Sequence, residues 1–237
     1  MKNAEMLTRC HEIANFLNEG DRAAFDFFQA HPEHEPNAVT GGLGALIVAL
    51  IRDLERDINA DEARAAGRLS PLKAAQRIIK AAQDCPREAL HGAWIAGGLQ
   101  CMCDGYRAFR LVEHLPGLPA VRDGLEPFNV AGCIDPAWDG FTQPLQLPEL
   151  AEVKAWVKAE KARRKGTGGK FLDPICWDFG EGLPYVDAQF LIDAMELLPG
   201  CRCRISERRP ELGGLYLESP AGDGLLLPRK RPTKRPE

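Results

Sequence analysis

Residues 99–111 read Leu99-Gln-Cys-Met-Cys-Asp104-Gly105-Tyr106-Arg107-Ala-Phe-Arg-Leu111, two strand-like runs joined by an Asp-Gly pair. This pair between two apolar runs is the strongest short signal for a β-hairpin, because both turn positions tolerate positive φ. The stretch therefore predicts antiparallel strands over Leu99–Cys103 and Tyr106–Val112. A further strand over Ala89–Ala96, before a Gly97-Gly98 turn, would extend the hairpin into a three-stranded meander.

A helix precedes this meander, and the same order recurs near the end of the sequence. Ser70-Pro71 fits an N-cap followed by proline at the first helical position, which predicts a helix over Leu72–Gln83. Asp187 is a candidate N-cap for a second helix over Ala188–Leu198. Strands are then expected over Cys201–Ser206, Gly214–Glu218 and Leu225–Lys230, with a hairpin turn at Pro220–Gly224.

The fold class predicted from this order is α+β, with one domain over residues 67–231 made of two helix-plus-antiparallel-meander halves. The halves are expected at about residues 70–148 and 149–231. Residues 113–148 are rich in proline and glycine, so a connector is expected there, with one short strand near Phe128–Val130. The second half is expected to open with a helix over Leu150–Arg164, followed by one or two short extended pieces over Trp177–Val186.

Residues 1–66 are expected to form a separate helical unit. Helices are predicted over residues 4–18, after Asp21 and from Thr40 onward, where leucine and isoleucine recur at three- and four-residue steps. The unit carries 12 acidic and 6 basic side chains, whereas residues 149–170 carry 3 acidic and 7 basic ones. A basic tail over residues 232–237 ends the sequence.

The composition is that of an ordinary globular protein, with 45% hydrophobic and 27% charged residues and a net charge of −4. The first residues lack the basic-then-apolar pattern of a signal peptide. The longest apolar run, Ala45–Ile51, is far shorter than the roughly 18 residues needed to span a bilayer. We therefore expect a cytoplasmic protein without membrane contact, whose eight cysteines stay reduced.

Three short motifs resemble bacterial DNA polymerase sliding clamps. Residues 183–198 (LPYVDAQFLIDAMELL) are similar to the helix that precedes the final strands of those proteins, and residues 223–229 (DGLLLPR) to their terminal strand. Residues 104–107 (DGYR) are similar to a hairpin that recurs in clamp domains. The resemblance covers about residues 70–112 and 183–231. It implies a single clamp-like domain with an added N-terminal helical segment, whereas a clamp subunit repeats the domain two or three times.

The resemblance implies a non-enzymatic accessory protein of DNA metabolism that binds DNA, replication or repair proteins, or both. A homo-oligomer and an origin on a mobile element belong to this hypothesis. In clamps the proline-containing terminal strand helps to wall a hydrophobic groove for partner peptides. Leu227 and Pro228 match that strand, and Arg229 stands where the family has an apolar residue. The alternative is a protein-interaction module that uses the fold only as a scaffold, without DNA contact.

Basic side chains are the candidates for contact with nucleic acid. Lys154, Lys158 and Lys161 share one face of a predicted helix by their spacing. Together with basic positions of the helix over Leu72–Gln83, the candidate residues are Lys73, Arg77, Lys80, Lys154, Lys158, Lys161, Arg163, Arg164, Lys165 and Lys170. The competing interpretation is a solvated surface helix. The helix over Ala188–Leu198 carries carboxylates and no lysine or arginine, which disfavours phosphate contact there.

Two cysteine pairs, Cys101-Met-Cys103 and Cys201-Arg-Cys203, occupy matching places in the two halves. Alternation along a strand puts both members of each pair on one face. Four cysteines could hold zinc, but zinc ligands usually come as CxxC on turns, so buried free thiols are expected. The five histidines show no HExxH spacing. We expect no catalytic residue, no metal and no cofactor, and a cysteine-based or metal-dependent enzyme is the third hypothesis.

Overall fold

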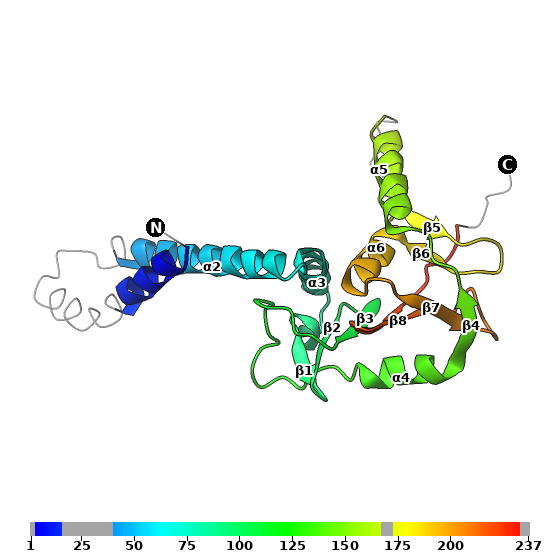
Figure 1. Cartoon of the computed structure of the whole chain (residues 1–237), viewed down its shortest axis with the longest axis horizontal. Helices are drawn as coiled ribbons and strands as arrows, with labels where there is room; N and C mark the ends of the chain where they lie inside the picture. The colour runs from blue at the N-terminus through cyan, green and yellow to red at the C-terminus, as the bar shows by residue number, and fades with distance from the viewer. Residues whose placement is uncertain (1–2, 16–39, 167–172, 233–237) are drawn as a thin grey trace, which may run out of the picture. The chain divides into compact units, whose positions relative to one another are not determined.

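The computed structural model describes residues 3–15, 40–166 and 173–232 (Figure 1). The chain divides into two compact units, Met1–Leu69 and Ser70–Glu237. The helix expected after Asp21 and nearly all of the basic tail lie outside the described residues, as does the candidate residue Lys170.

The described part of the first unit is helical. Residues 3–15 form one helix, and α2 spans Thr40–Ala65. Ile47 and Leu54 of α2 are buried, as is Cys10 of the preceding helix. The charged face of α2 carries exposed pairs such as Arg56–Asp53, 2.9 Å apart. The leucine and isoleucine spacing therefore predicted α2 correctly.

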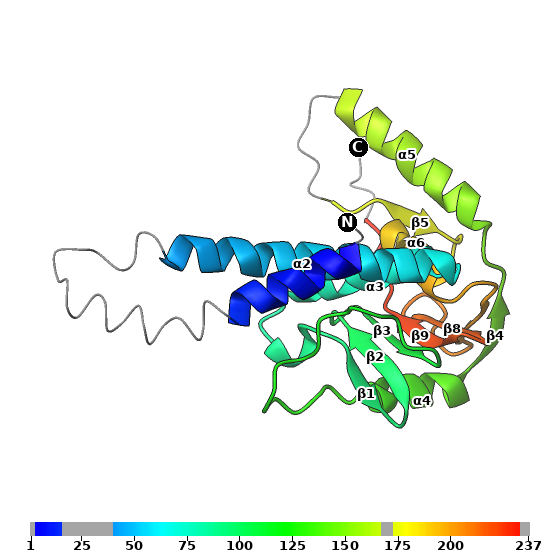
Figure 2. The same ribbon diagram turned by 60° about the vertical axis from the view of Figure 1, so that its left-hand side comes forward.

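The second unit is built around a seven-stranded antiparallel sheet (Figure 2). Its strands, in the order β1-β2-β3-β9-β8-β7-β4, are β1 (Trp94–Ala96), β2 (Leu99–Cys103), β3 (Arg107–Leu111), β9 (Gly222–Leu226), β8 (Leu215–Ser219), β7 (Arg202–Ser206) and β4 (Phe141–Leu145). The other elements are α3 (Leu69–Ala82), a 3-10 turn (Glu88–Leu90), α4 (Ala131–Gly140), α5 (Leu150–Gly166), α6 (Ala188–Leu197) and a two-stranded sheet of β5 (Cys176–Asp178) and β6 (Tyr185–Asp187). The predicted α+β class is confirmed.

The two meanders meet at a seam between β3 and β9. Arg107 pairs with Leu226 and Leu111 pairs with Gly222, so β1-β2-β3 and β9-β8-β7 belong to one sheet. Gly222 has φ 145°, and a methyl group on it would lie 2.0 Å from the carbonyl oxygen of Arg110. The close approach of the two strands therefore requires glycine at this position.

The Asp-Gly hairpin forms as predicted. One carboxylate oxygen of Asp104 accepts hydrogen bonds from the backbone N–H groups of Tyr106 and Arg107, both at 3.0 Å. Gly105 has φ 91°, which a side chain would disfavour. The other oxygen of Asp104 accepts from Arg107 Nε at 2.7 Å. Asp104 is therefore a buried turn residue whose oxygens are occupied by the hairpin itself.

Helices cover both faces of the sheet. Figures 1 and 2 show α3 and α6 on one face and α4 on the other. On the α4 side, Ile134 and Ala137 pack with Cys103, Ala108 and Tyr216 in one buried cluster. The α6 side buries apolar residues of the helices and of alternate strand positions, among them Leu72, Ile78, Met102, Phe109, Leu191, Leu215 and Leu217.

The structure corrects the prediction for residues 113–148. This segment contains α4 and β4, and Pro136 lies inside α4, so its proline content concealed a helix and a strand. Because β4 pairs with β7, the first half supplies the edge strand of the second half. The two halves are thus interlocked across the expected boundary at residue 148.

Strand boundaries differ in two further places. The last strand is Gly222–Leu226, not Leu225–Lys230, because Ser219 pairs with Gly222 across a turn of only Pro220 and Ala221. Only Trp94–Ala96 of the first predicted strand is extended, and it is preceded by the 3-10 turn. Glycine-rich composition hid the start of β9, since glycine has low strand propensity.

Both edges of the sheet are obstructed. Ala93, the residue before β1, donates its N–H to Pro119 O at 2.8 Å and accepts a hydrogen bond from Val121 N–H at 3.1 Å. Residues 119–121 therefore lie along this end of the edge strand. At the other edge, β4 has an irregularity between Phe141 and Gln143 and carries Pro144, which has no backbone N–H. Such edges disfavour the addition of a strand from another chain.

Candidate nucleic-acid interface

A groove of about 610 Å³ lies along α5 and α6 and reaches α3. Its basic side chains come from two helices: Arg77 of α3 and Lys154, Lys158, Lys161 and Lys165 of α5. Its remaining lining is Val157 and Ala162 of α5 and Gln189, Ile192 and Glu196 of α6. Five of the candidate residues named from the sequence are therefore brought together, and the lining carries five basic groups against one carboxylate.

The lysines of α5 form a stripe because their spacing is four, three and four residues. At 1.5 Å per residue, the stripe is about 16 Å long from Lys154 to Lys165. Val153 and Val157 are buried and help to fix α5, which packs against α6. Among the described residues no carboxylate pairs with Lys158, Lys161 or Lys165, so this part of the chain gives these three groove-lining charges no counter-ion.

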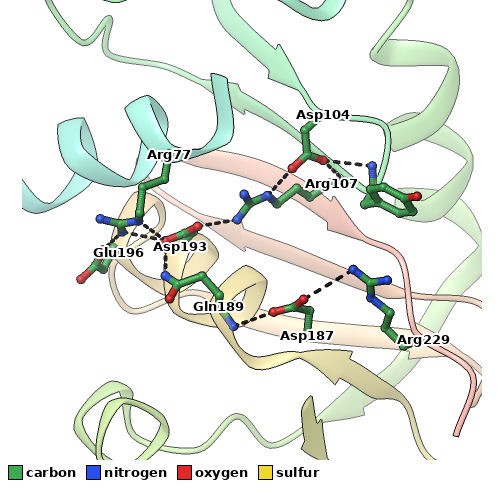
Figure 3. Close-up of polar contacts among 9 residues, drawn as sticks. Arg77, Asp104, Arg107, Asp187, Gln189, Asp193, Glu196 and Arg229 are labelled. Atoms are coloured by element: carbon green, nitrogen blue, oxygen red, sulfur yellow. Dashed lines mark hydrogen bonds and ion pairs between the residues drawn. The ribbon is translucent and has the colours of Figure 1, made fainter. Parts of the chain in front are cut away.

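Carboxylates of α6 hold Arg77 (Figure 3), and one of them also pairs with Lys154. Arg77 donates from Nε to Asp193 at 2.7 Å and also pairs with Glu196. Lys154 Nζ lies 2.6 Å from Glu196 Oε1. Burial acts to raise the pKa of Glu196, but hydrogen bonds from Lys154 and Arg77 outweigh it and lower the pKa below its ordinary value. Glu196 is therefore an ionised carboxylate inside a cationic groove.

Asp193 connects the groove to the sheet. Its side chain is fully buried and accepts hydrogen bonds from Arg77, from Arg107 and, at 2.9 Å, from Gln189. The Arg107 guanidinium, which also pairs with Asp104, lies 4.3 Å from the ring centroid of Phe190. Figure 3 shows the resulting chain of alternating charges from the β2–β3 turn to α3 and α6. This network joins α6 of the second half to α3 and the β2–β3 hairpin of the first half.

The other basic candidates are not part of the groove lining. Lys73 and Lys80 are exposed on α3, at positions that flank Arg77 on the same helix face. Arg163 and Arg164 pair with Glu160 at 2.7 and 3.0 Å. Hydrogen bonds from these two arginines lower the pKa of Glu160 to about 2. Glu160 therefore balances one of their two positive charges within α5.

Gln189, Ile192 and Glu196 of α6 line the groove but were not predicted as part of the interface, and neither was Asp193, which holds Arg77. The absence of lysine and arginine from this helix disfavoured phosphate contact in the sequence analysis. In the structure, Asp193 and Glu196 are used internally by Arg77, Arg107 and Lys154. The carboxylates of α6 therefore balance basic side chains of neighbouring elements. The sequence contains no local pattern that indicates these pairs.

No protein-family model, curated protein or solved structure matches the chain. Membership of the sliding-clamp family therefore stays a prediction that rests on the three short motifs. Among the described residues, no helix is both long and apolar enough to cross a membrane.

Leu227 and Pro228, the predicted peptide-groove residues, directly follow β9 in the chain, in a segment that bonds to β6 at Arg229. Leu227 donates its N–H to Tyr106 O at 2.8 Å, and Arg229 donates its N–H to Tyr185 O at 2.6 Å. The side chains of Leu227 and Tyr106 are exposed. The Arg229 guanidinium lies 5.3 Å from the Tyr106 ring centroid. Exposed Tyr106 and Leu227 and partly exposed Arg229 form an aromatic and cationic platform that does not line the basic groove.

The two cysteine pairs face opposite sides of the sheet. Cys203 lies opposite Leu217, in a cross-strand row that continues through β9 and β3 to Met102. Cys101 and Cys103 flank Met102 and therefore face the α4 side, where they are buried. The pairs do not converge, and the described parts of the chain contain no cluster of three or more metal-ligating side chains.

Alkylation should confirm that these thiols are structural. Burial raises the pKa of Cys103 to about 11 and also raises that of Cys203 well above its ordinary value. We expect iodoacetamide at pH 8 to modify both at least about tenfold more slowly in the folded protein than in urea, because the thiolate is the nucleophile. Peptide mass spectrometry over time measures the rates. Equal rates in the two conditions would contradict the assignment.

Proposed function

We propose that this protein is a non-enzymatic accessory protein of DNA metabolism and that the groove between α5, α6 and α3 binds the DNA backbone. The observation that carries the proposal is the convergence of Arg77 with the lysine stripe of α5 on one groove. Phosphate contacts by lysine and arginine supply affinity without sequence specificity. Val157 and Ile192, which are both buried, form the apolar base of the same groove.

The motifs and the topology support the same proposal. A sliding-clamp-like domain would place two helix-plus-meander halves in one sheet with their helices on one face, and α3 and α6 have that relation (Figure 2). The obstructed sheet edges disfavour a ring closed by strand pairing, so the proposal is for binding by a single copy. A cytoplasmic location, where DNA and replication proteins occur, belongs to the proposal.

Charge reversal of the stripe tests this function. We expect the triple variant Lys158→Glu, Lys161→Glu, Lys165→Glu to lose about a hundredfold or more in affinity for a fluorescein-labelled 20-nucleotide DNA. The plot of log affinity against log salt should also become shallower by about 2, because each phosphate contact contributes a slope of about 0.7. Fluorescence anisotropy at several salt concentrations, on single-stranded and duplex DNA, measures both quantities.

The matched control changes the same number of charges elsewhere. Arg87, Arg122 and Arg208 are exposed and do not line the groove. Their replacement by glutamate should alter affinity by less than about threefold, the size of a long-range charge effect screened by salt. An equal loss in the two triple variants, or no binding by the original protein at low salt, would refute the groove as a DNA site.

The second candidate function is a protein-interaction module. The observation that favours it is the platform of exposed Tyr106 and Leu227 with partly exposed Arg229, since aromatic and arginine side chains dominate the binding energy of protein interfaces. In that case DNA binding would be absent, and the fold would serve as a scaffold. The salt-dependent DNA assay separates the two functions.

A further inference from the structure

Glu196 occupies a special place in the basic groove. Among the residues that line it, Glu196 alone carries a carboxylate. That carboxylate lies between Arg77 and Lys154 and pairs with both. It is 8% exposed, whereas Arg77 and Lys154 are 40% and 46% exposed. The two cations are therefore accessible to a ligand from the groove, and their shared counter-ion belongs to the protein.

We propose that Glu196 is an internal competitor for phosphate. Its ionised carboxylate takes the position between Arg77 and Lys154 that a backbone phosphate of bound DNA would otherwise take, and it thereby limits the affinity of the groove. Carboxylate and phosphate oxygens accept the same charge-assisted hydrogen bonds from arginine and lysine. The inference rests on the proposed function, because it assigns a regulator of affinity to that same groove.

The contacts of Arg77 and Lys154 differ, and they give Asp193 a structural role and Glu196 a competing one. Arg77 is anchored by the fully buried Asp193, so it would keep its position without Glu196. Lys154 has Glu196 as its recorded partner and is nearly half exposed. Asp193 therefore holds the arginine in place, while Glu196 neutralises charge that faces the groove.

A positioning role for Glu196 predicts the opposite effect on affinity. If the carboxylate were needed to orient Lys154, its removal would weaken DNA binding. The same stripe contains Lys158, Lys161 and Lys165, and no carboxylate of the described residues pairs with them. The helix itself therefore orients the stripe. Removal of the negative charge should therefore strengthen binding.

The test replaces the carboxylate by an amide. Glu196→Gln should bind the 20-nucleotide DNA about tenfold more tightly, equivalent to about 1.4 kcal/mol. The salt dependence should steepen by about 0.7, the contribution of one additional phosphate contact to a single strand. The matched control is Glu160→Gln, which changes the net charge equally and also removes the partner of two basic side chains, but outside the groove. We expect the control to change affinity by less than about twofold.

A double-mutant cycle with Lys154→Met identifies the released charge. Lys154→Met removes the cation that Glu196→Gln would release, so Glu196→Gln should give little or no gain in affinity when it is combined with Lys154→Met. Thermal unfolding of each variant shows whether it is folded at the assay temperature. Unchanged or weaker binding by folded Glu196→Gln, or an equal gain in Glu160→Gln, would overturn the competitor role. The proposed function itself fails on separate results: charge reversal of the lysine stripe that leaves DNA binding intact, an equal loss in the control triple variant, or no DNA binding by the original protein at low salt.

Discussion

Replacement of Asp193 by alanine is expected to lower the free energy of unfolding by about 3–5 kcal/mol, the cost of breaking a buried ion pair by removing one partner. Asp193 is fully buried and accepts hydrogen bonds from Arg77, Arg107 and Gln189. Arg107 is itself 3% exposed, so its guanidinium would keep only Asp104 as an ionic partner. Urea unfolding followed by circular dichroism measures the change.

The control for this prediction is Asp135→Ala. Asp135 also pairs with an arginine, Arg110, at 2.6 Å, but its side chain is 59% exposed. Exposed pairs contribute about 0–1 kcal/mol, so this substitution should be nearly neutral. If the two substitutions have equal effects, the chain of alternating charges does not hold α6 in place. The comparison matters for function because the same network positions Arg77 in the groove.

Local signals in the sequence were sufficient for much of the second unit. The Asp-Gly pair predicted β2 and β3 because a tight turn fixes its own geometry through Asp104. Apolar spacing and capping residues predicted α3, α5 and α6 to within three residues at each end. These elements share one property: the interactions that determine them lie within a few residues along the chain.

The segments that were not predicted correctly, α4 and β4, depend on contacts with residues that are distant in the sequence. Pro136 argues against a helix locally, but Ile134 and Ala137 bury their side chains against Tyr216 and neighbouring strands, and this burial outweighs the local preference. β4 has weak strand character and is extended because β7 supplies its hydrogen bonds. Tertiary contacts thus determine the secondary structure of both α4 and β4.

The candidate site likewise has one part that local spacing predicts and one part that depends on distant contacts. The four- and three-residue spacing predicted that Lys154, Lys158 and Lys161 share one face of α5, because helix geometry alone sets it, and in the structure Lys165 extends this stripe. The participation of Arg77 in the groove, and its contact with Asp193, join residues 116 positions apart. No local pattern encodes that pairing, so the role of the carboxylates on α6 could be found only in the folded structure.

Replacement of Gly222 by alanine should destabilise the seam between the halves by about 2–6 kcal/mol. Glycine is required for two reasons: φ is 145°, a region that costs other residues about 1–3 kcal/mol, and the added methyl group would lie 2.0 Å from Arg110 O. The backbone of β3 cannot yield as a side chain can, so overpacking adds about 1–3 kcal/mol. Urea unfolding measures the loss, and amide exchange should accelerate along β9.

The control, Gly140→Ala, separates this clash from the general effect of replacing glycine. Gly140 ends α4, and a methyl group there meets no atom within 4 Å. Both substitutions reduce the freedom of the unfolded chain equally, so Gly140→Ala should be neutral or stabilising by up to about 1 kcal/mol. A stable Gly222→Ala variant would mean that β9 can withdraw from β3 without loss. The pairing that joins the two meanders would then not hold the unit together, and α3 and α6 would have to be held by the Asp193 network alone.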